Sequence, residues 1–168
     1  MKRTKNIVTS RIRVLALDLA TTTGWALSED IGTTQNISSG IWKLKINRFA
    51  GGGMRYVRLR KFLDEIGKVD LLSFEEVHRH MGTAAAHIYG GCLATITAWA
   101  EENNIPYEGI PVQTIKKFAT GKGNASKEKM VQAFTDKTGQ IPESDDEADA
   151  YWILMYTLEH IMPSKKAK

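Results

Sequence analysis

The sequence of 168 residues has one cysteine, four prolines and no long apolar run. A single cysteine, Cys92, excludes an internal disulfide framework, and we expect it to be a small packed side chain in an apolar helix. No apolar stretch reaches the roughly 20 residues that a membrane-spanning helix needs. The basic opening segment is followed by residues that are too few and too polar for a secretory signal. We therefore expect a cytoplasmic protein that has no membrane partner.

Two common ligand-binding patterns are also missing. His78 and His80 are too close to ligate zinc from successive helical turns, and no cysteine accompanies them, so a polar loop is the simpler interpretation. A P-loop is excluded because Gly121-Lys122 is followed by Gly123 rather than by serine or threonine. We expect no nucleotide cofactor.

What the sequence does contain is typical of one globular domain. Hydrophobic residues make up 42% and charged residues 25% of the chain, and 168 residues suffice for a substantial core. The formal net charge of +4 suits a partner that is rich in phosphate. We predict a basic arm over residues 1–12, a single domain over residues 13–162 and a basic tail over residues 163–168.

Charges of opposite sign are separated along the chain. Cations gather at the two predicted ends, in a run from Arg55 to Lys61 and in a cluster from Lys116 to Lys129, whereas acids concentrate over residues 145–149. This distribution could place an acidic pocket inside a basic surface. The cations of the first run alternate with apolar residues at helical spacing, which a solvated helix face explains.

An apolar segment that carries one carboxylate organises the chain. Residues 13–20 have the length of a strand and contain Asp18 near their end. Burying an unpaired charge costs several kcal/mol, so Asp18 should be solvated, paired or bound to a metal; capping a turn is the plainest alternative. A turn over residues 21–24, a returning strand from Trp25 and a third strand over residues 35–44 predict an antiparallel meander.

The second half of the chain alternates strands and helices. Residues 69–75 form another apolar strand that ends in a carboxylate, Glu75, and residues 105–111 form a further short strand. Ser144 and Glu147 make a capping-box pattern at the start of the last helix. The order predicts an α/β domain with a mixed five-stranded sheet, three antiparallel strands and then parallel strands, flanked by helices. The predicted helices cover residues 54–66, 83–103, 112–119, 127–138 and 145–160.

Four carboxylates form a candidate metal site. Asp146 and Asp149 are three residues apart and project from one face of the predicted last helix. Together with Asp18 and Glu75 they supply hard oxygen ligands, which Mg²⁺ and Mn²⁺ prefer. The helix dipole alone would account for acids in the first turn, but Asp149 lies between alanines at the start of an apolar run.

Four motifs of the chain resemble those of the RuvC family of Holliday-junction resolvases in order and spacing. The matching segments are Ala16-Leu17-Asp18-Leu19 with Thr23-Gly24-Trp25, Phe74-Glu75-Glu76-Val77, Gly121-Lys122-Gly123-Asn124-Ala125-Ser126-Lys127 and Asp146-Glu147-Ala148-Asp149-Ala150. The likeness spans most of the chain, from about residue 14 to residue 158. It implies an RNase H-like fold and a homodimer that cuts four-way DNA junctions with two divalent metal ions per active site.

The resemblance also implies roles for particular residues. The catalytic carboxylates would hold two Mg²⁺ ions, with Mn²⁺ able to substitute; they are Asp18, Glu75, Asp146 and Asp149. Lys127 matches the functional lysine and would hold the scissile phosphate at a helix N-terminus, although it could also be an exposed lysine without a special role. The residues expected to bind DNA are Lys116, Lys117, Lys122, His78 and Arg79, and either Lys116 or Lys117 matches a second, helix-borne lysine.

The helix predicted over residues 83–103 bears on the expected homodimer. It is rich in alanine and glycine, which let another element approach closely. That element could be the domain's own sheet or the same helix of a second copy of the chain.

The chain departs from the family pattern at two places. His78 stands where many members have an aromatic residue that stacks on bases at the junction centre, and imidazole stacks less strongly. Leu19-Ala20 replaces the usual Pro-Gly after the first carboxylate. Both changes suggest a divergent branch of the family, such as a viral or phage type.

Three other functions are open at this point. A related RNase H-like nuclease could cut flaps, other branched DNA or RNA·DNA hybrids. A non-catalytic protein could bind junctions with a degenerate acidic site, against which the presence of all four acids argues. Residues 18–24 also resemble the phosphate loop of actin-like ATPases, but those proteins need two such lobes and 168 residues supply one.

Overall fold

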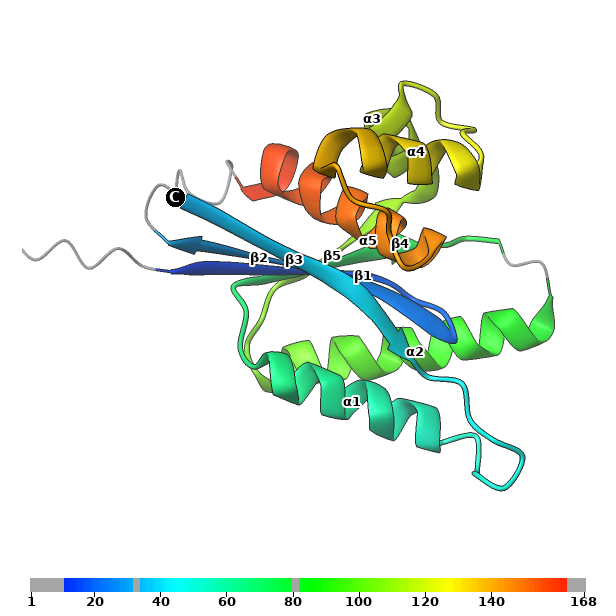
Figure 1. Cartoon of the computed structure of the whole chain (residues 1–168). Coiled ribbons are helices and arrows are strands. Elements are labelled where there is room, and N and C mark those ends of the chain that lie inside the picture. The colour runs from blue at the N-terminus through cyan, green and yellow to red at the C-terminus, as the bar shows by residue number, and fades with distance from the viewer. Residues whose placement is uncertain (1–10, 32–33, 80–81, 163–168) are drawn as a thin grey trace, which may run out of the picture.

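A five-stranded sheet forms the centre of the domain, in the order β3-β2-β1-β4-β5 (Figure 1). This computed structural model describes residues 11–31, 34–79 and 82–162. Nearly all of the predicted basic arm and the whole of the predicted basic tail lie outside the described residues. The strands are β1 (Ile12–Asp18), β2 (Thr22–Ile31), β3 (Thr34–Lys43), β4 (Leu71–Glu76) and β5 (Tyr107–Pro111).

The strand pairing confirms the predicted mixed sheet. β1 pairs with β2 and β2 with β3 in antiparallel orientation, whereas β1 pairs with β4 and β4 with β5 in parallel orientation. Short turns join the antiparallel strands, and each parallel strand follows a helical crossover. Several strand boundaries differ from the prediction. β1 ends at Asp18 rather than at residue 20, and β2 begins at Thr22 rather than at Trp25. β4 and β5 begin at Leu71 and Tyr107, each two residues later than predicted.

Helices cover both faces of the sheet (Figure 1). One face carries α1 (Met54–Ile66) and α2 (Thr83–Glu102), and the other carries α3 (Val112–Thr120), α4 (Lys127–Thr138) and α5 (Asp145–Tyr156). A π-helical turn over Thr157–Ile161 follows α5, so the last predicted helix changes its hydrogen-bond pattern before residue 160. Among the described residues, no helix is both long enough and apolar enough to span a membrane.

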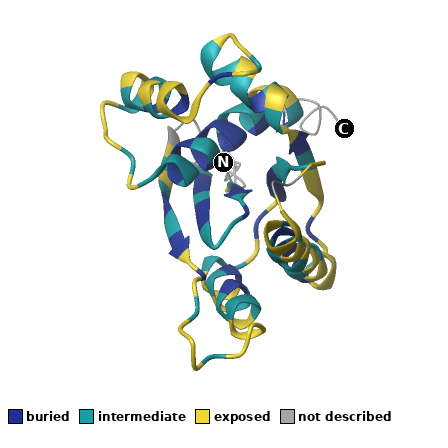
Figure 2. Ribbon diagram, turned by 90° about the vertical axis from the view of Figure 1, so that its right-hand side faces the viewer, coloured by how far each residue is buried: buried dark blue, intermediate teal, exposed yellow. Residues whose placement is uncertain are grey.

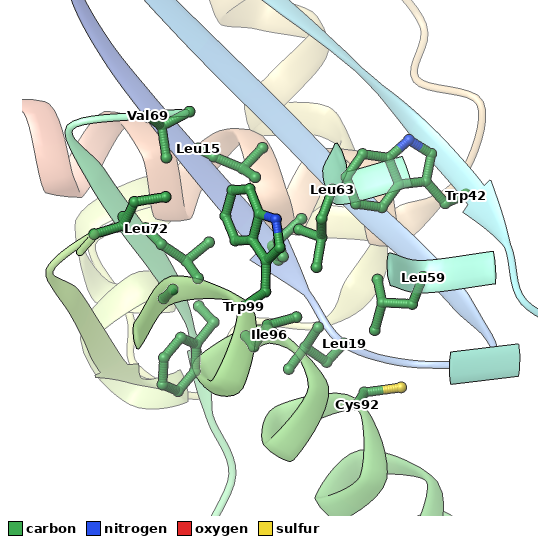
Figure 3. Packing of buried hydrophobic residues seen from close by; sticks show 14 of the residues in the cluster. Leu15, Leu19, Trp42, Leu59, Leu63, Val69, Leu72, Cys92, Ile96 and Trp99 are labelled. Carbon is green, nitrogen blue, oxygen red and sulfur yellow. The ribbon is translucent and has the colours of Figure 1, made fainter. Parts of the chain in front are cut away.

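Alternation along β1 divides the core into two clusters. Leu15 packs with Trp99 and the buried faces of α1 and α2, whereas Ala16 packs in the cluster that contains α5. Figure 3 shows the first cluster, in which Trp99 lies beside the strand residue Leu15. Cys92 is fully buried there, and desolvation raises the pKa of its thiol to about 11. The expectation of a packed cysteine in an apolar helix is therefore confirmed.

The same alternation directs Asp18 toward the layer of α5. Leu17 lies opposite Phe74 in the parallel β1–β4 pair, so Asp18 and Glu75 come next to each other at the ends of their strands. Side chains two residues apart in a strand share a face, and Ala16 packs on the α5 side. Two carboxylates from neighbouring strands therefore lie at one edge of the sheet, on the face that α5 covers.

Gly24 lets α5 approach the sheet at this edge. It pairs with Asp18 across the β1–β2 ladder, and a Cβ built on it would lie 1.8 Å from the carbonyl oxygen of Asp146. The helix backbone cannot move aside as a flexible side chain can, so only a residue without a Cβ fits there. The close approach brings the first turn of α5 over the end of β1.

The predicted capping box at the start of α5 is wrong. Ser144 lies at the N-cap position, but its hydroxyl is 3.2 Å from Asp146 Oδ2 and makes no cap hydrogen bond. Glu147 instead accepts hydrogen bonds from the Glu143 N–H and from the Ser39 hydroxyl, each at 2.6 Å. A partner on β3 thus holds the buried Glu147 carboxylate against the sheet, in place of the local pattern.

The small residues of α2 serve two surfaces. Gly91 faces α1, because a Cβ built on it would lie 2.2 Å from the hydroxyl oxygen of Tyr56. Gly90, Ala94 and Ala98 are exposed on another side of the helix. Some of the small residues of α2 therefore pack within the domain, and others remain on the surface.

We expect Gly24→Ala to lower the free energy of unfolding by about 3 kcal/mol, because the added methyl group overlaps the Asp146 backbone. Urea denaturation measures the change. Gly90→Ala is the matched control: a Cβ there meets no atom within 4 Å, so the variant should gain about 0.5–1 kcal/mol from helix propensity. Equal unfolding midpoints for Gly24→Ala and wild type would contradict the close approach of α5.

Candidate functional site

Asp18 lies at the centre of a group of carboxylates. Its pKa is raised well above the ordinary 3.8, first because its side chain is desolvated and then because the charges of Glu75, Asp149 and Asp146 oppose its ionisation. A hydrogen bond with Glu75 raises the pKa of Asp18 further, because it stabilises the protonated form of Asp18. The arrangement therefore favours the protonated form of Asp18 unless a cation takes the place of the proton.

Asp146 and Asp149 come from the first two turns of α5. The Oδ1 atom of Asp149 is buried and has no hydrogen-bond partner among the described residues. Desolvation, followed by the charges of Glu75 and Asp145, raises the pKa of Asp149 to about 7, although Lys116 opposes the shift. The pKa of Asp146 is also raised, first by desolvation and then by Asp145. The structure thus brings all four predicted carboxylates into electrostatic contact.

Lys127 lies at the rim of this cluster, as the first residue of α4. Its Nζ is 2.5 Å from Asp145 Oδ2, and this hydrogen bond raises the pKa of the lysine, with smaller contributions from Asp146 and Asp149. The lysine is therefore charged near neutral pH. Because 73% of its side chain is exposed, a ligand can reach it.

Lys116 of α3 connects the carboxylates to a groove beside them. It lines a small cavity together with Glu75 and Asp149, and it also lines a groove of about 540 Å³ together with His78 and Arg79. Three of the five residues predicted to bind DNA therefore share one groove. The remaining lining residues are Glu76, Val77, Pro111, Val112, Gln113, Gly123 and Asn124.

The other two residues predicted to bind DNA lie elsewhere on the surface. Lys117 and Lys122 are exposed, and neither is among the residues that line this groove. Lys117 lies in the last turn of α3, where a cation interacts favourably with the helix dipole. Of the two lysines that sequence reasoning could not separate, Lys116 is thus the one beside the carboxylates.

The donor set fits divalent cations of the Mg²⁺ type. Carboxylate oxygens are their preferred ligands, and a cation would neutralise the repulsion that raises the pKa of Asp18 and of Asp149. As the side chains stand, no three His, Cys, Asp or Glu residues of the described ranges are arranged to hold one metal ion. Binding would require the hydrogen bond between Asp18 and Glu75 to open and the carboxylates to turn toward the ion.

Sequence reasoning gave no role to three residues that shape this site. Gly24 was placed in a turn over residues 21–24, but β2 begins at Thr22 and Gly24 lies within the strand. Ser39 is one of two adjacent serines of β3, and Asp145 was explained by the helix dipole. The strand register places Gly24 opposite Asp18, and this pairing could have signalled its role. The roles of Ser39 and Asp145 depend on contacts with residues far away in the sequence, Glu147 and Lys127.

No protein-family model and no curated protein matches the chain. Solved structures do match it. RuvC of T. thermophilus in complex with a Holliday junction substrate is similar with a TM-score of 0.76 and 18% identity, over 91% of this chain and 96% of that chain. A second Thermus thermophilus RuvC structure gives a TM-score of 0.67 and 19% identity, over 93% of this chain and 97% of that chain.

The yeast mitochondrial Holliday junction resolvase Ydc2 is also similar, with a TM-score of 0.60 and 15% identity over 93% of this chain and 84% of that chain. The chain therefore has the RNase H-like fold of RuvC, and the predicted fold is confirmed.

We expect Asp149 to make the cation-free protein less stable as the pH rises from about 4 to about 7. Its pKa of about 7 in the folded state exceeds the ordinary 3.8, so over this range the folded protein keeps a proton that the unfolded chain has released. Asp149→Asn removes this titration. Its free energy of unfolding should therefore rise relative to wild type as the pH increases, in urea denaturation with EDTA.

Gly90→Ala serves as the control and should keep the wild-type pH profile, because its position lies in open space on α2. A difference between wild type and Asp149→Asn that is the same at about pH 4 and about pH 8 would contradict the buried, like-charged environment of this carboxylate.

Proposed function

We propose that this protein is a divalent-metal-dependent endonuclease that resolves four-way DNA junctions. One observation carries the proposal: Asp18, Glu75, Asp146 and Asp149 converge from β1, β4 and α5 at one edge of the sheet. The similarity of fold to RuvC, one structure of which contains a Holliday junction substrate, supports the same kind of substrate.

Hydrolysis of a phosphodiester needs neutralisation of its charge and a nucleophile that forms near neutral pH. Two bound Mg²⁺ ions, which Mn²⁺ can replace, would supply an activated water and neutralise the leaving oxygen. Asp18, which is surrounded by the other three acids, is our candidate for the ligand shared by both ions. Glu75 would hold one ion, and Asp146 and Asp149 would hold the other.

Lys127 would bind the scissile phosphate. In the structure its ammonium group donates to Asp145, and an incoming phosphate oxygen offers the same kind of charge-assisted hydrogen bond. The N-terminus of α4 adds a partial positive charge at this position. Asp145 would act as a positioning residue that orients the lysine until the substrate arrives.

The groove beside the carboxylates would take an adjoining part of the DNA. Arg79 and Lys116 supply positive charge along it, and His78, whose side chain is 73% exposed, presents an imidazole that can stack on a base. Lys117 and Lys122 would contact phosphates outside the groove. Lys116 joins the groove to the carboxylates, because it also lines the small cavity that contains Glu75 and Asp149.

Paired nicks across a junction require two active sites, so the proposal includes a homodimer. The exposed small residues of α2, Gly90, Ala94 and Ala98, would permit a second copy to approach closely. The proposed location is the cytoplasm, where the DNA substrate would be met.

Cleavage of labelled four-way, flap, duplex and RNA·DNA substrates in Mg²⁺, Mn²⁺ or EDTA tests the proposal. We expect paired nicks in the four-way junction, with either metal and not with EDTA. Asp146→Asn should slow cleavage at least about 10²-fold, because a misplaced ion no longer aligns the reaction. Junction binding should stay unchanged or become tighter, because a negative charge near the phosphates is lost.

Asp136→Asn is the matched control, since Asp136 is exposed on α4 and accepts a hydrogen bond from Gln132. It should cleave at the wild-type rate. Preferred cleavage of flaps or hybrids would replace the junction assignment by a related nuclease, and binding without cleavage of any substrate would leave a junction-binding protein.

Lys127→Ala should slow single-turnover cleavage of the four-way junction about 10²-fold and leave the unfolding midpoint close to that of wild type. The stability should change little because the Lys127 side chain is mostly exposed. Lys129→Ala, on the same helix and also exposed, is the control and should cleave normally. A wild-type rate for Lys127→Ala would mean that Lys127 is an exposed lysine without a role in cleavage.

A further inference from the structure

A cation-rich part of the sequence without acids includes the connection that leaves the sheet at the same edge as the carboxylates. Residues 31–63 contain seven lysines and arginines and no aspartate or glutamate. Within it, residues 44–53 connect β3 to α1, and the Leu44 N–H donates to the Thr21 carbonyl at 2.8 Å, just beyond the end of β1. The connection therefore leaves the sheet where β1 and β4 end in Asp18 and Glu75 (Figure 1).

The tip of this connection is a hydrogen-bonded turn around Phe49. The Ala50 N–H donates to the Asn47 carbonyl at 3.2 Å, and the Phe49 N–H donates to Asn47 Oδ1 at 3.0 Å. From α1, the Arg58 guanidinium donates to the Lys45 carbonyl at 2.9 Å. The turn that presents Phe49 is thus held both by the side chain of Asn47 within the turn and by Arg58 of the neighbouring helix α1.

Phe49 is exposed although it is large and apolar. Its exposed fraction is 83%, and the Arg48 guanidinium lies 4.7 Å from the centre of the ring. This cation–π contact occupies one side of the ring and leaves the rest open to a ligand. Figure 2 shows the connection as the exposed loop at the bottom, in a view onto the edge where it leaves the sheet.

The cations around the ring are available for a ligand. Lys43, Lys45 and Arg48 are exposed, and none of the ion pairs found within the described ranges involves them. The combination of an open aromatic ring, free cations and no nearby acid in the sequence complements a nucleic acid better than it complements an apolar protein surface.

We infer that the turn of Arg48 and Phe49 is a second DNA contact, where Phe49 stacks on an unpaired base and Lys43, Lys45 and Arg48 bind phosphates. A ring can stack only on a base whose face is free, as at a branch point or in a single strand, so this contact would favour branched DNA over duplex. The inference rests on the proposed function in that DNA is the ligand, but it does not depend on cleavage.

Binding of a four-way junction with 2-aminopurine at the branch point, in EDTA, tests the inference. Phe49→Ala should bind the junction about tenfold more weakly and lose the quenching of 2-aminopurine that stacking causes. Its affinity for a continuous duplex of equal length should change less than about twofold. Phe49→Trp should bind the junction as wild type does, because it keeps an aromatic ring. Val57→Ala, which alters a different exposed apolar residue, on α1, should also behave as wild type.

Each other outcome overturns the inference. If Phe49→Ala keeps the wild-type affinity and quenching, Phe49 does not contact the DNA. If it loses equal affinity for junction and duplex, Phe49 does not stack on an unpaired base. If Phe49→Ala changes the mass of the protein in light scattering and leaves DNA binding intact, the turn is a protein interface.

Cleavage of the same junction by the wild-type protein in Mg²⁺ separates this inference from the proposed function. A protein that does not cut, but whose junction binding depends on Phe49, would sustain the inference and remove the nuclease proposal. A protein that cuts, but whose binding does not depend on Phe49, would do the reverse. A wild-type protein that binds neither DNA would overturn both.

Discussion

Close contact between α5 and the β1–β2 pair is the constraint on which the candidate site depends. Because Gly24 has no Cβ, the backbone of Asp146 rests directly on β2, one strand away from Asp18. Glu147 holds the same helix end against β3 through the Ser39 hydroxyl. The acids repel one another and could not assemble this site by themselves. Backbone packing and one partly buried hydrogen bond therefore set their position.

The packing that builds the site also makes it electrostatically unfavourable. Desolvation and like charges raise the pKa of Asp18, Asp146 and Asp149, which means that their ionised forms are destabilised in the fold. Lys116 and Lys127 offset this repulsion only from the rim. A core selected for stability alone would not keep so many acids together, and such clusters are typical of functional sites. The remaining negative charge is what a divalent cation would neutralise.

Patterns that act within one element were sufficient to predict most of the fold. Apolar runs of strand length that end in a carboxylate located β1 and β4. Ser126 caps α4 in the ordinary local way, since its hydroxyl accepts from the N–H of Lys129 three residues away. The failures involve partners that are distant in sequence. The capping pattern at Glu147 is complete locally, yet Ser39 forms the bond instead. Likewise, no local pattern distinguishes Lys116 from Lys117, since the packing of α3 decides which one meets the carboxylates.

Separation of charge along the sheet edge would let one small domain combine an acidic site with the proposed affinity for DNA. An acidic cluster repels phosphates, but at physiological ionic strength this repulsion is screened beyond about 8 Å. Cations that lie farther away than this, on other segments, can therefore attract the DNA almost independently of the acids. The connection over residues 44–53 contains no acid, and it leads from the sheet edge into α1, in the layer opposite α5 (Figure 1). Part of the affinity for DNA would then reside in a different layer from the metal ligands, so that sequence changes in this connection could alter substrate choice without disturbing those ligands.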